Sequence, residues 1–319
     1  MFMNIFKNKF YIGIDLGGTT AKFALFDNKD NIIKKWSILS NIYKKDSVNG
    51  LINAICKSII DELYSLNINL NSLKGIGIGV PGPVLEYKYV VKAVNLNWKK
   101  KFDLSFEIKK RLGKKIKVIV NNDANVAALG EYHFGNGKSH NSICLLIMGT
   151  GFGSGIVING KILNGENGAA GEVGHLQVDF SDKVHKCNCG NKGCLETVGS
   201  GTGLVNVYNT YCAKKKDKKI TAKIICEKAY KNDKSCLKAI ELSMSYVADM
   251  ILVLNKVLDV SCFLISGGLS GGGSIIIKYI EKRFKERNVK NWIKPKILFS
   301  KLKNDAGIYG AFALVKYHD

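Results

Sequence analysis

Strand-like and helix-like periods alternate along the chain, beginning with a paired strand pattern. Residues 10–35 predict a β-hairpin, because the runs YIGID and KFALFD flank the turn sequence LGGTTA. Residues 46–66 place apolar side chains at helical spacing and predict an amphipathic helix. The chain therefore opens with a strand, a turn, a second strand and a helix.

The next elements are buried strands that lead into turns. GIGIGV at 75–80 predicts a buried strand that ends in Pro81-Gly82-Pro83. Residues 103–112 predict a short amphipathic helix, and IKVIVNND at 116–123 predicts a strand that leads into a helix beginning near Ala124.

A second hairpin pattern follows in the other half of the chain. The run ICLLIM at 143–148 predicts a strand, 149–155 is a glycine loop, and IVING returns. Each half thus has a strand, a Gly/Thr-rich turn and a second strand, a pattern that a two-lobed molecule with a cleft between related halves would give. Three later elements complete the prediction: a helix at 236–258, a strand at 262–266 and a helix at 305–317.

Length and hydropathy fit a two-domain protein without a membrane anchor. The 319 residues allow two domains at roughly 100–200 residues each. No apolar run reaches the length of about 18 residues that a spanning helix needs. The apolar start is broken by Lys7 and Lys9 and stops at Asp15, which is too short for a signal peptide. We expect a cytoplasmic protein with no membrane partner.

The formal charge of +22 suggests nucleic-acid binding, but its composition favours another interpretation. Nearly all of the positive charge is lysine, spread along the chain, and arginine occurs only at Arg111, Arg283 and Arg287. Sequence-specific DNA readers favour arginine for bidentate contacts to guanine. We expect a solvated lysine-rich surface and no nucleic-acid partner.

Three glycine-rich turns are candidates for phosphate or nucleotide binding. In the turn from Asp15 to Thr20, backbone N–H groups can form an anion-binding concavity, and Asp15 could hold Mg²⁺ through water. A plain hairpin turn is the alternative. The loop at 149–155 is of the same kind, but it matches neither the dinucleotide fingerprint nor a P-loop. Gly267-Gly268, after a buried strand, could let a nucleoside lie against bare backbone.

The segment 121–125, NNDAN, follows a buried strand and starts a helix. A carboxylate there stands at the edge where ligands of α/β folds bind. Asp123 also fits a helix N-cap, and as a bare motif the capping interpretation is favoured.

Cysteines cluster in one segment, Cys187-Asn188-Cys189-Gly190-Asn191-Lys192-Gly193-Cys194. C-x-C-x4-C needs a fourth ligand for a tetrahedral zinc site, and His175 and His185 are both candidates. We favour His175, because a ligand only two residues before Cys187 would strain the cage. Three reduced thiols in a loop are the alternative. The metal would brace a loop and fix the His175 and Glu196 segments around one pocket.

These motifs together resemble the ROK family (repressors, open reading frames and kinases), especially its bacterial glucokinases. The resemblance covers the chain from Asp15 to about Gly310. The segments that carry it are IDLGGTTAKFALFD, GIGIGVPGPV, NLNW, NNDANVAALGE, GTGFGSGIVINGKIL, GENGAAGEVGH, CNCGNKGCLET and SGG.

The resemblance implies an α/β fold with two ribonuclease H-like lobes of the actin/hexokinase type and an interlobe cleft. The first lobe would be 1–121 with the returning helix 305–319. The second would be 122–304 with a zinc-binding loop at 175–196.

It also implies roles for individual residues. Asp123 would be the base for the sugar 6-hydroxyl. The remaining sugar contacts would be Gly82, Asn122, Glu172, His175 and Glu196. Zinc would be bound by His175, Cys187, Cys189 and Cys194. ATP and Mg²⁺ would be held by Asp15, Gly17, Gly18, Thr19, Thr20 and Lys22, and by Gly149, Thr150, Gly151 and Gly153, with Gly267 and Gly268 on the nucleoside side.

Two departures from the family pattern, Ser154 in the second loop and the looser GGLSGGG at 267–273, both touch the nucleotide side. The expected activity is phosphorylation of glucose by ATP, and the expected assembly is a homodimer. Kinases of fructose, mannose or N-acetylmannosamine are the nearest alternatives. A sugar-responsive DNA-binding regulator is a further one, against which the absence of a helix-turn-helix extension argues. A non-catalytic zinc protein is disfavoured by Asp15 and Asp123 together.

Overall fold

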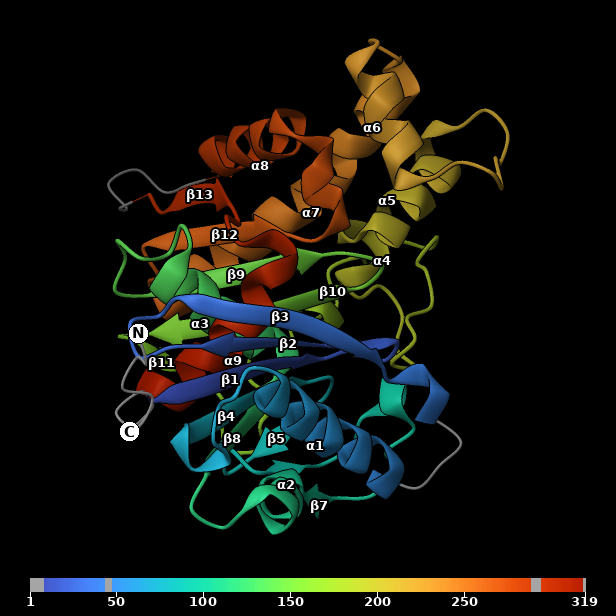
Figure 1. The fold of residues 1–319 in the computed structure, drawn as a ribbon. Helices are drawn as coiled ribbons and strands as arrows, with labels where there is room; N and C mark the ends of the chain where they lie inside the picture. The colour runs from blue at the N-terminus through green and yellow to red at the C-terminus, as the bar shows by residue number, and fades with distance from the viewer. Residues whose placement is uncertain (1–8, 44–47, 288–293, 318–319) are drawn as a thin grey trace. The chain divides into compact units, whose positions relative to one another are not determined.

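The computed structural model describes residues 9–43, 48–287 and 294–317, and the chain divides into two units (Figure 1). Unit 1 comprises Met1–Lys138, Gly160–Ala170 and Asn304–Asp319, and unit 2 comprises Ser139–Asn159 and Gly171–Lys303. These ranges assign 122–138 and 160–170 to the first unit, whereas the expected lobes placed them in the second. The lobe boundaries stay a prediction.

A mixed sheet forms the centre of unit 1, in the order β3-β2-β1-β4-β8. Strands β1 and β2 form the predicted hairpin. Strand β4 pairs parallel to β1, and β8 pairs parallel to β4. The sequence did not predict β3, which pairs antiparallel with β2. The strands are β1 (Phe10–Leu16), β2 (Thr20–Phe26), β3 (Ile32–Leu39), β4 (Leu73–Val80) and β8 (Lys117–Asn122).

The alternation of glycine and isoleucine in β4 explains how helices cover this sheet. Ile76 and Ile78 join the core that includes α1 and α2. Gly75 and Gly77 lie on the opposite face, where a Cβ atom would clash with Val315 and with the backbone of Ala311 in α9. Glycine thus lets α9 lie directly on the strands. The helices are α1 (Val48–Ser65), α2 (Leu104–Leu112), α3 (Asp123–Phe134) and α9 (Ala306–Tyr317).

Unit 2 repeats the strand pairing of unit 1. Its own strands lie in the order β10-β9-β12-β13. Strands β9 and β10 form an antiparallel hairpin, β12 pairs parallel to β9, and β13 pairs parallel to β12. The bounds are β9 (Ile143–Met148), β10 (Phe152–Ile158), β12 (Cys262–Ser266) and β13 (Lys296–Phe299). The repeat of hairpin and parallel strands bears out the expectation of two related halves.

The α-helices of unit 2 lie after residue 195 in the sequence, and the last of them follows β12. They are α4 (Glu196–Gly199), α5 (Gly201–Val207), α6 (Ala222–Tyr230), α7 (Lys234–Leu258) and α8 (Ser274–Arg287). Short strands elsewhere are β5 (Val84–Leu85), β6 (Tyr89–Val90), β7 (Phe102–Asp103) and β11 (Lys161–Ile162).

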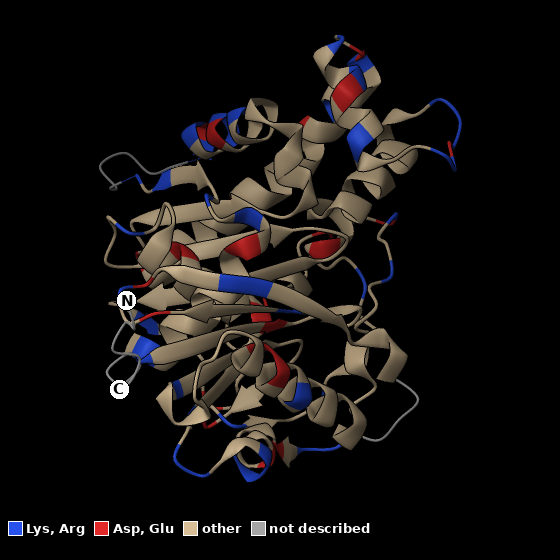
Figure 2. Ribbon diagram, in the orientation of Figure 1, with Lys and Arg blue, Asp and Glu red and all other residues tan. Residues whose placement is uncertain are grey.

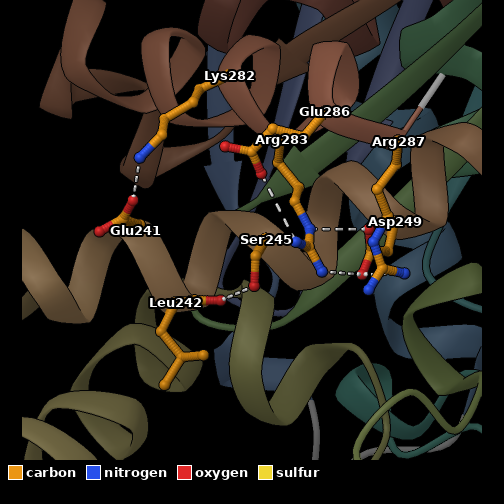
Figure 3. A network of polar contacts seen from close by, with 8 residues as sticks. All are labelled: Glu241, Leu242, Ser245, Asp249, Lys282, Arg283, Glu286 and Arg287. Carbon is orange, nitrogen blue, oxygen red and sulfur yellow. Dashed lines mark hydrogen bonds and ion pairs between the residues drawn. The ribbon is translucent and has the colours of Figure 1, made fainter.

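Charged side chains join α7 to α8 on the surface of unit 2 (Figure 3). Arg283 Nε lies 3.2 Å from Asp249 Oδ1, and Arg287 reaches the same carboxylate at 3.5 Å. Lys282 pairs with Glu241 at 2.6 Å. Exposed pairs of this kind are worth about 0–1 kcal/mol each, so they orient the helices more than they stabilise them.

Lysine and arginine occur on many separate helices and loops (Figure 2). Within the described residues, no helix combines the length and apolar character needed to cross a bilayer.

Candidate functional site

Three parallel strands of unit 1 bring two predicted carboxylates to one edge of the sheet. Asp15 in β1 is aligned with Gly79 in β4, and Gly79 with Asn121 in β8. Asp123 follows two residues after Asn121, at the start of α3. Adjacent strands lie about 4.8 Å apart, so Asp15 and Asn121 are separated by about 10 Å across the sheet. This is the carboxyl edge of the parallel strands, where ligands of α/β sheets bind.

Asp15 is packed between a lysine and the start of the last helix. Lys22 Nζ lies 3.8 Å from Asp15 Oδ2. Burial raises the pKa of the Asp15 carboxyl, and the positive charge of Lys22 acts in the opposite direction. A bound divalent cation would favour the ionised form of Asp15 and would therefore lower its pKa.

The turn after Asp15 is fixed by its own backbone and by Ser40. Gly17 N–H donates to the Thr20 carbonyl at 3.0 Å, and the Ser40 hydroxyl donates to the Gly17 carbonyl at 2.6 Å. A Cβ atom on Gly18 would fall 2.9 Å from the carbonyl oxygen of Asn95. Gly18 is therefore required by packing, whatever the turn binds, and Thr19 is exposed beside it.

Asn122, and not Asp123, caps α3. Its Oδ1 accepts from the N–H groups of Ala124 at 2.9 Å and Asn125 at 3.2 Å. The capping interpretation of Asp123 is therefore wrong, because the cap position falls one residue earlier and Asp123 is the first helical residue. Asp123 Oδ1 accepts from the Ala124 N–H at 2.8 Å.

The amide of Asn122 also holds the turn after β4. Asn122 Nδ2 donates to the Gly82 carbonyl at 3.3 Å. Gly82 has φ +110°, and a Cβ atom there would collide with the Lys92 carbonyl, so only glycine fits. Gly82, Asn122 and Asp123 are thus brought together within unit 1, as the sequence predicted for three of its sugar contacts.

In unit 2 the predicted metal ligands form one cluster. One ligand atom from each of His175, Cys187, Cys189 and Cys194 lies within 4.8 Å of all the others. His175 Nδ1 lies 3.6 Å from Cys187 Sγ, and Cys189 Sγ lies 3.7 Å from Cys194 Sγ. The cluster includes His175, the favoured fourth ligand, whereas His185 Nε2 contacts Thr210 Oγ1 at 2.9 Å.

These distances fit tetrahedral zinc. Zn–S bonds of about 2.3 Å and a Zn–N bond of about 2.0–2.1 Å place two ligand sulfurs about 3.8 Å apart and a sulfur and a nitrogen about 3.6 Å apart. Burial raises the pKa of Cys187. It also raises the pKa of Cys194, to about 12, while the backbone N–H of Asn191 lowers the pKa of Cys189. A divalent cation would reverse the effect of burial, because thiolates are its ligands.

The loop that carries the thiols depends on glycines with positive φ. Gly190 has φ +101° and Gly193 has φ +70°. A Cβ atom on Gly193 would collide with the Asp179 carbonyl, so the close return of the chain requires glycine there. The sequence CGNKGC therefore encodes the turn as well as the ligands.

The second nitrogen of His175 faces a carboxylate. Nε2 lies 3.9 Å from Glu172 Oε2, while Nδ1 points to the sulfur cluster. Glu172 and His175 remain about half exposed in their side chains, at 50% and 40%. His175 is thus both a predicted metal ligand and a predicted sugar contact, with one ring nitrogen for each role.

Glu196 joins the zinc loop to the loop at 149–155. Its Oε2 accepts from the Phe152 N–H at 3.0 Å, and Cys187 Sγ lies 3.6 Å from its Oε1. A Cβ atom on Gly151 would collide with this carboxylate, so glycine at 151 is explained by Glu196. Ser154, the departure from the family pattern, is buried and donates its hydroxyl to the Gly171 carbonyl.

Gly268 borders a cavity in unit 2 of about 310 Å³. Residues of α6, among them Cys226 and Tyr230, line it together with Gly272. A Cβ atom on Gly268 would meet nothing within 4 Å, so its backbone is open to a ligand. Gly267 has φ +84° and packs against Met148, which makes it a structural glycine.

The predicted residues therefore divide between the units. Unit 1 holds Gly82, Asn122 and Asp123 together with Asp15 to Lys22, and unit 2 holds Glu172, His175, Glu196, the zinc cluster and the glycines at 149–153 and 267–268. Three supporting residues were not predicted from the sequence. The Ser40 hydroxyl bonds Gly17, Gly307 packs against the Asp15 carboxyl group, and Asn164 bonds Asn121. Of these three residues, only Gly307 gives a signal in the sequence, as a glycine in the otherwise apolar start of α9.

The chain is similar to known sugar kinases in sequence and in fold. A family model described as "ROK family" matches residues 11–318. The chain is 33% identical to a glucokinase of Halalkalibacterium halodurans over 98% of this chain and 97% of that protein. It is 31% identical to an N-acetyl-D-glucosamine kinase of Histophilus somni, over 97% and 100% of the two chains. The crystal structure of a ROK family glucokinase from Streptomyces griseus in complex with glucose and AMPPNP superposes with a TM-score of 0.73 at 27% identity, covering 97% of this chain and 99% of that chain.

Proposed function

Because the chain belongs to the ROK family of sugar kinases, we propose that it transfers the terminal phosphate of ATP to the 6-hydroxyl of glucose. The observation that carries the proposal is the alignment of Asp15, Gly79 and Asn121 across parallel strands. It puts a carboxylate suited to a nucleotide-bound Mg²⁺ and the carboxylate of Asp123 on the same sheet edge. The span of about 10 Å leaves room for a phosphate, its metal ion and an acceptor hydroxyl.

Asp123 is the general base in this mechanism. Its position at the first turn of α3 is fixed by the Asn122 cap, so the carboxylate does not have to move to accept a proton from the sugar. Asp15 would hold Mg²⁺ through water, and the ion would supply positive charge against the phosphate groups. Lys22 lies beside Asp15 and adds positive charge on the phosphate side.

The sugar contacts of unit 2 depend on zinc. His175 would bind the metal through Nδ1, which would leave Nε2 for a sugar hydroxyl, and Glu172 lies next to that nitrogen. When bound, zinc holds the His175 segment and the cysteine loop in one geometry. The glycine loop at 149–153 and the cavity beside Gly268 take the phosphates and the nucleoside of ATP.

Glucose is our first choice of sugar because the glucokinase relative is 33% identical and a similar structure was solved with glucose. N-acetyl-D-glucosamine is the second candidate, supported by the relative at 31% identity. Both sugars present a 6-hydroxyl, and they differ at C2. The homodimer expected from the family stays a proposal, which sedimentation velocity tests.

A coupled assay of ADP release tests the activity. Glucose, N-acetylglucosamine, mannose, N-acetylmannosamine and fructose are compared, each with and without Mg²⁺. We expect the highest kcat/KM for glucose, no turnover without Mg²⁺, and glucose 6-phosphate as the product identified by NMR. Higher kcat/KM for N-acetylglucosamine would replace the substrate assignment, and no turnover with any hexose would refute the kinase proposal.

A further inference from the structure

Asparagine side chains form a chain of hydrogen bonds beneath the Asp123 turn. Asn121 is 1% exposed, and its Oδ1 accepts from the N–H of Asn122 at 2.7 Å and from Asn125 Nδ2 at 3.4 Å. Its Nδ2 donates to Asn164 Oδ1 at 3.0 Å. The side chain of Asn121 is thus held between the residue that caps α3 and a residue 43 positions further along the chain.

Asn164 connects three parts of unit 1. Its Oδ1 accepts from Asn121 and also lies 3.5 Å from Asn125 Nδ2. Its side chain hydrogen-bonds with the phenol of Tyr87, whose backbone carbonyl accepts from the Val120 N–H at 2.8 Å. Strand β8 is therefore held by Asn164 both directly, through Asn121, and indirectly, through Tyr87.

The backbone of Asn164 closes the loop that it begins. Its carbonyl accepts from the Ala170 N–H at 3.1 Å. Within this loop Gly168 packs so closely on Val84 that a Cβ atom would clash with its backbone. Ala170 is followed in the sequence by Gly171 and Glu172. Asn164 thus holds both the Asp123 turn and the 164–170 loop within unit 1.

We propose that Asn164 is a positioning residue for sugar phosphorylation, which holds the Asp123 turn of unit 1 in place through Asn121. The inference rests on the proposed function, because it assigns Asn164 to the base and the sugar ligands named there. Asn164 acts through Asn121 and through the loop closed at Ala170, and not by contact with the sugar.

The network is poorly suited to stability alone. Amide groups taken out of water gain little net free energy from their hydrogen bonds, and apolar residues of the same shape can replace them with little loss. Asn125 is 2% exposed, and among the described residues its Oδ1 finds no donor. An acceptor buried in this way lowers stability, because nothing compensates for its lost contact with water. Buried polar groups without a hydrogen-bond partner occur mainly at functional sites, so this network favours a positioning role for Asn164.

The test compares Asn164→Ala with Asn167→Ala, an exposed asparagine of the same loop. We expect Asn164→Ala to lower kcat/KM for the sugar by about 10- to 100-fold, because a shift of about 1 Å can cost 100-fold in rate. The fall should come from both a lower kcat and a higher sugar KM, with KM for ATP and the zinc content unchanged. Asn164→Asp keeps the acceptor for Asn121 and should recover most of the loss. Asn167→Ala should behave as the unmodified protein.

A purely structural role predicts another result. Asn164→Ala would then melt at a lower temperature, while the folded protein kept its kcat and its sugar KM, and this outcome overturns the inference. If Asn164→Ala does not fold, Tyr87→Phe takes its place. Removal of the phenol should lower kcat by about threefold at an unchanged KM for ATP, and an unchanged kcat would overturn the inference.

The proposed function fails separately from this inference. If Asp123→Asn retains turnover, the base assignment is wrong and the role of Asn164 falls with it. If Asp123→Asn is inactive while Asn164→Ala has unchanged sugar kinetics, only the role of Asn164 is refuted.

Discussion

Gly307 lies directly against the carboxyl group of Asp15. A Cβ atom at position 307 would fall 2.7 Å from Asp15 Cγ and 2.9 Å from Asp15 Oδ2, closer than real Cβ contacts. Gly307 is the second residue of α9, and Asp15 lies near the end of β1, 292 positions earlier by the difference of the two numbers. The start of α9 therefore determines where the carboxylate predicted to hold Mg²⁺ can lie.

Gly307→Ala should move Asp15. The added methyl group must displace either the carboxylate or the start of α9, so we expect kcat to fall by about 10- to 100-fold and the Mg²⁺ requirement to rise. Titration of activity with Mg²⁺ measures both effects. Zinc content is the internal control, because the zinc ligands belong to unit 2. An unchanged kcat with an unchanged Mg²⁺ dependence would show that Asp15 takes no part.

Asp15→Asn should stabilise the protein in the absence of Mg²⁺ and nucleotide. Burial raises the pKa of Asp15 in the folded state, so the folded protein holds this proton more tightly than the unfolded chain. The free energy of unfolding then falls as the pH rises from the unfolded pKa through the folded pKa. At pH 7 the ionised carboxylate costs stability, and asparagine removes that cost.

Thermal unfolding at pH 7 and at pH 3 measures this effect. We expect Asp15→Asn to melt higher than the unmodified protein at pH 7, with the difference shrinking at pH 3, and to have lost at least about 100-fold in kcat. Asp61→Asn, an exposed aspartate on α1, is the control and should leave melting unchanged. A lower melting temperature for Asp15→Asn at pH 7 would contradict the assigned direction.

Removal of one thiol should empty the zinc site and weaken sugar binding. Cys189→Ser removes one ligand of four, so zinc per chain should fall from about one to near zero and the sugar Kd should rise about tenfold or more. Metal analysis and calorimetric titration measure the two quantities. Cys212→Ser, outside the cluster, should change neither. Full zinc content in Cys189→Ser would exclude the assigned ligand set.

A larger side chain in the cavity beside Gly268 should hinder ATP. Cys226 is 6% exposed and lines the cavity of about 310 Å³. Cys226→Phe should raise KM for ATP about tenfold while the sugar KM changes little, because the sugar ligands lie elsewhere in the chain. Steady-state kinetics with each substrate varied in turn measure the split. Cys212→Phe places the same ring outside the cavity and serves as the control. An unchanged KM for ATP would remove this cavity from the nucleotide site.

Local patterns in the sequence predicted much of this molecule. The runs around 10–26 and 143–158 predicted both hairpins, and the helical period at 46–66 predicted α1. The cysteine spacing with His175 predicted the metal cluster, because three ligands lie in one short loop. In each case the determinant is contained within a few residues or a single period.

Other features depend on contacts between distant residues, and no local period encodes them. The sequence allowed Asp123 as the cap of α3, but Asn122, the last residue of β8, keeps an extended backbone and takes that position. Glycine at 151 was interpreted as a phosphate contact, whereas it also makes room for Glu196, 45 positions later. No local pattern distinguishes Asn164, because its hydrogen bond with Asn121 joins residues 43 positions apart.

The turnover of Asp123→Asn tests the central claim most directly. Asparagine preserves the size of the side chain and the hydrogen bond to the Ala124 N–H, but it cannot accept the proton of the 6-hydroxyl. With glucose binding measured separately by calorimetry, we predict an unchanged glucose Kd within about threefold and a kcat lower by about 100-fold or more. A kcat within about twofold of the unmodified protein, at normal glucose affinity, would contradict the account.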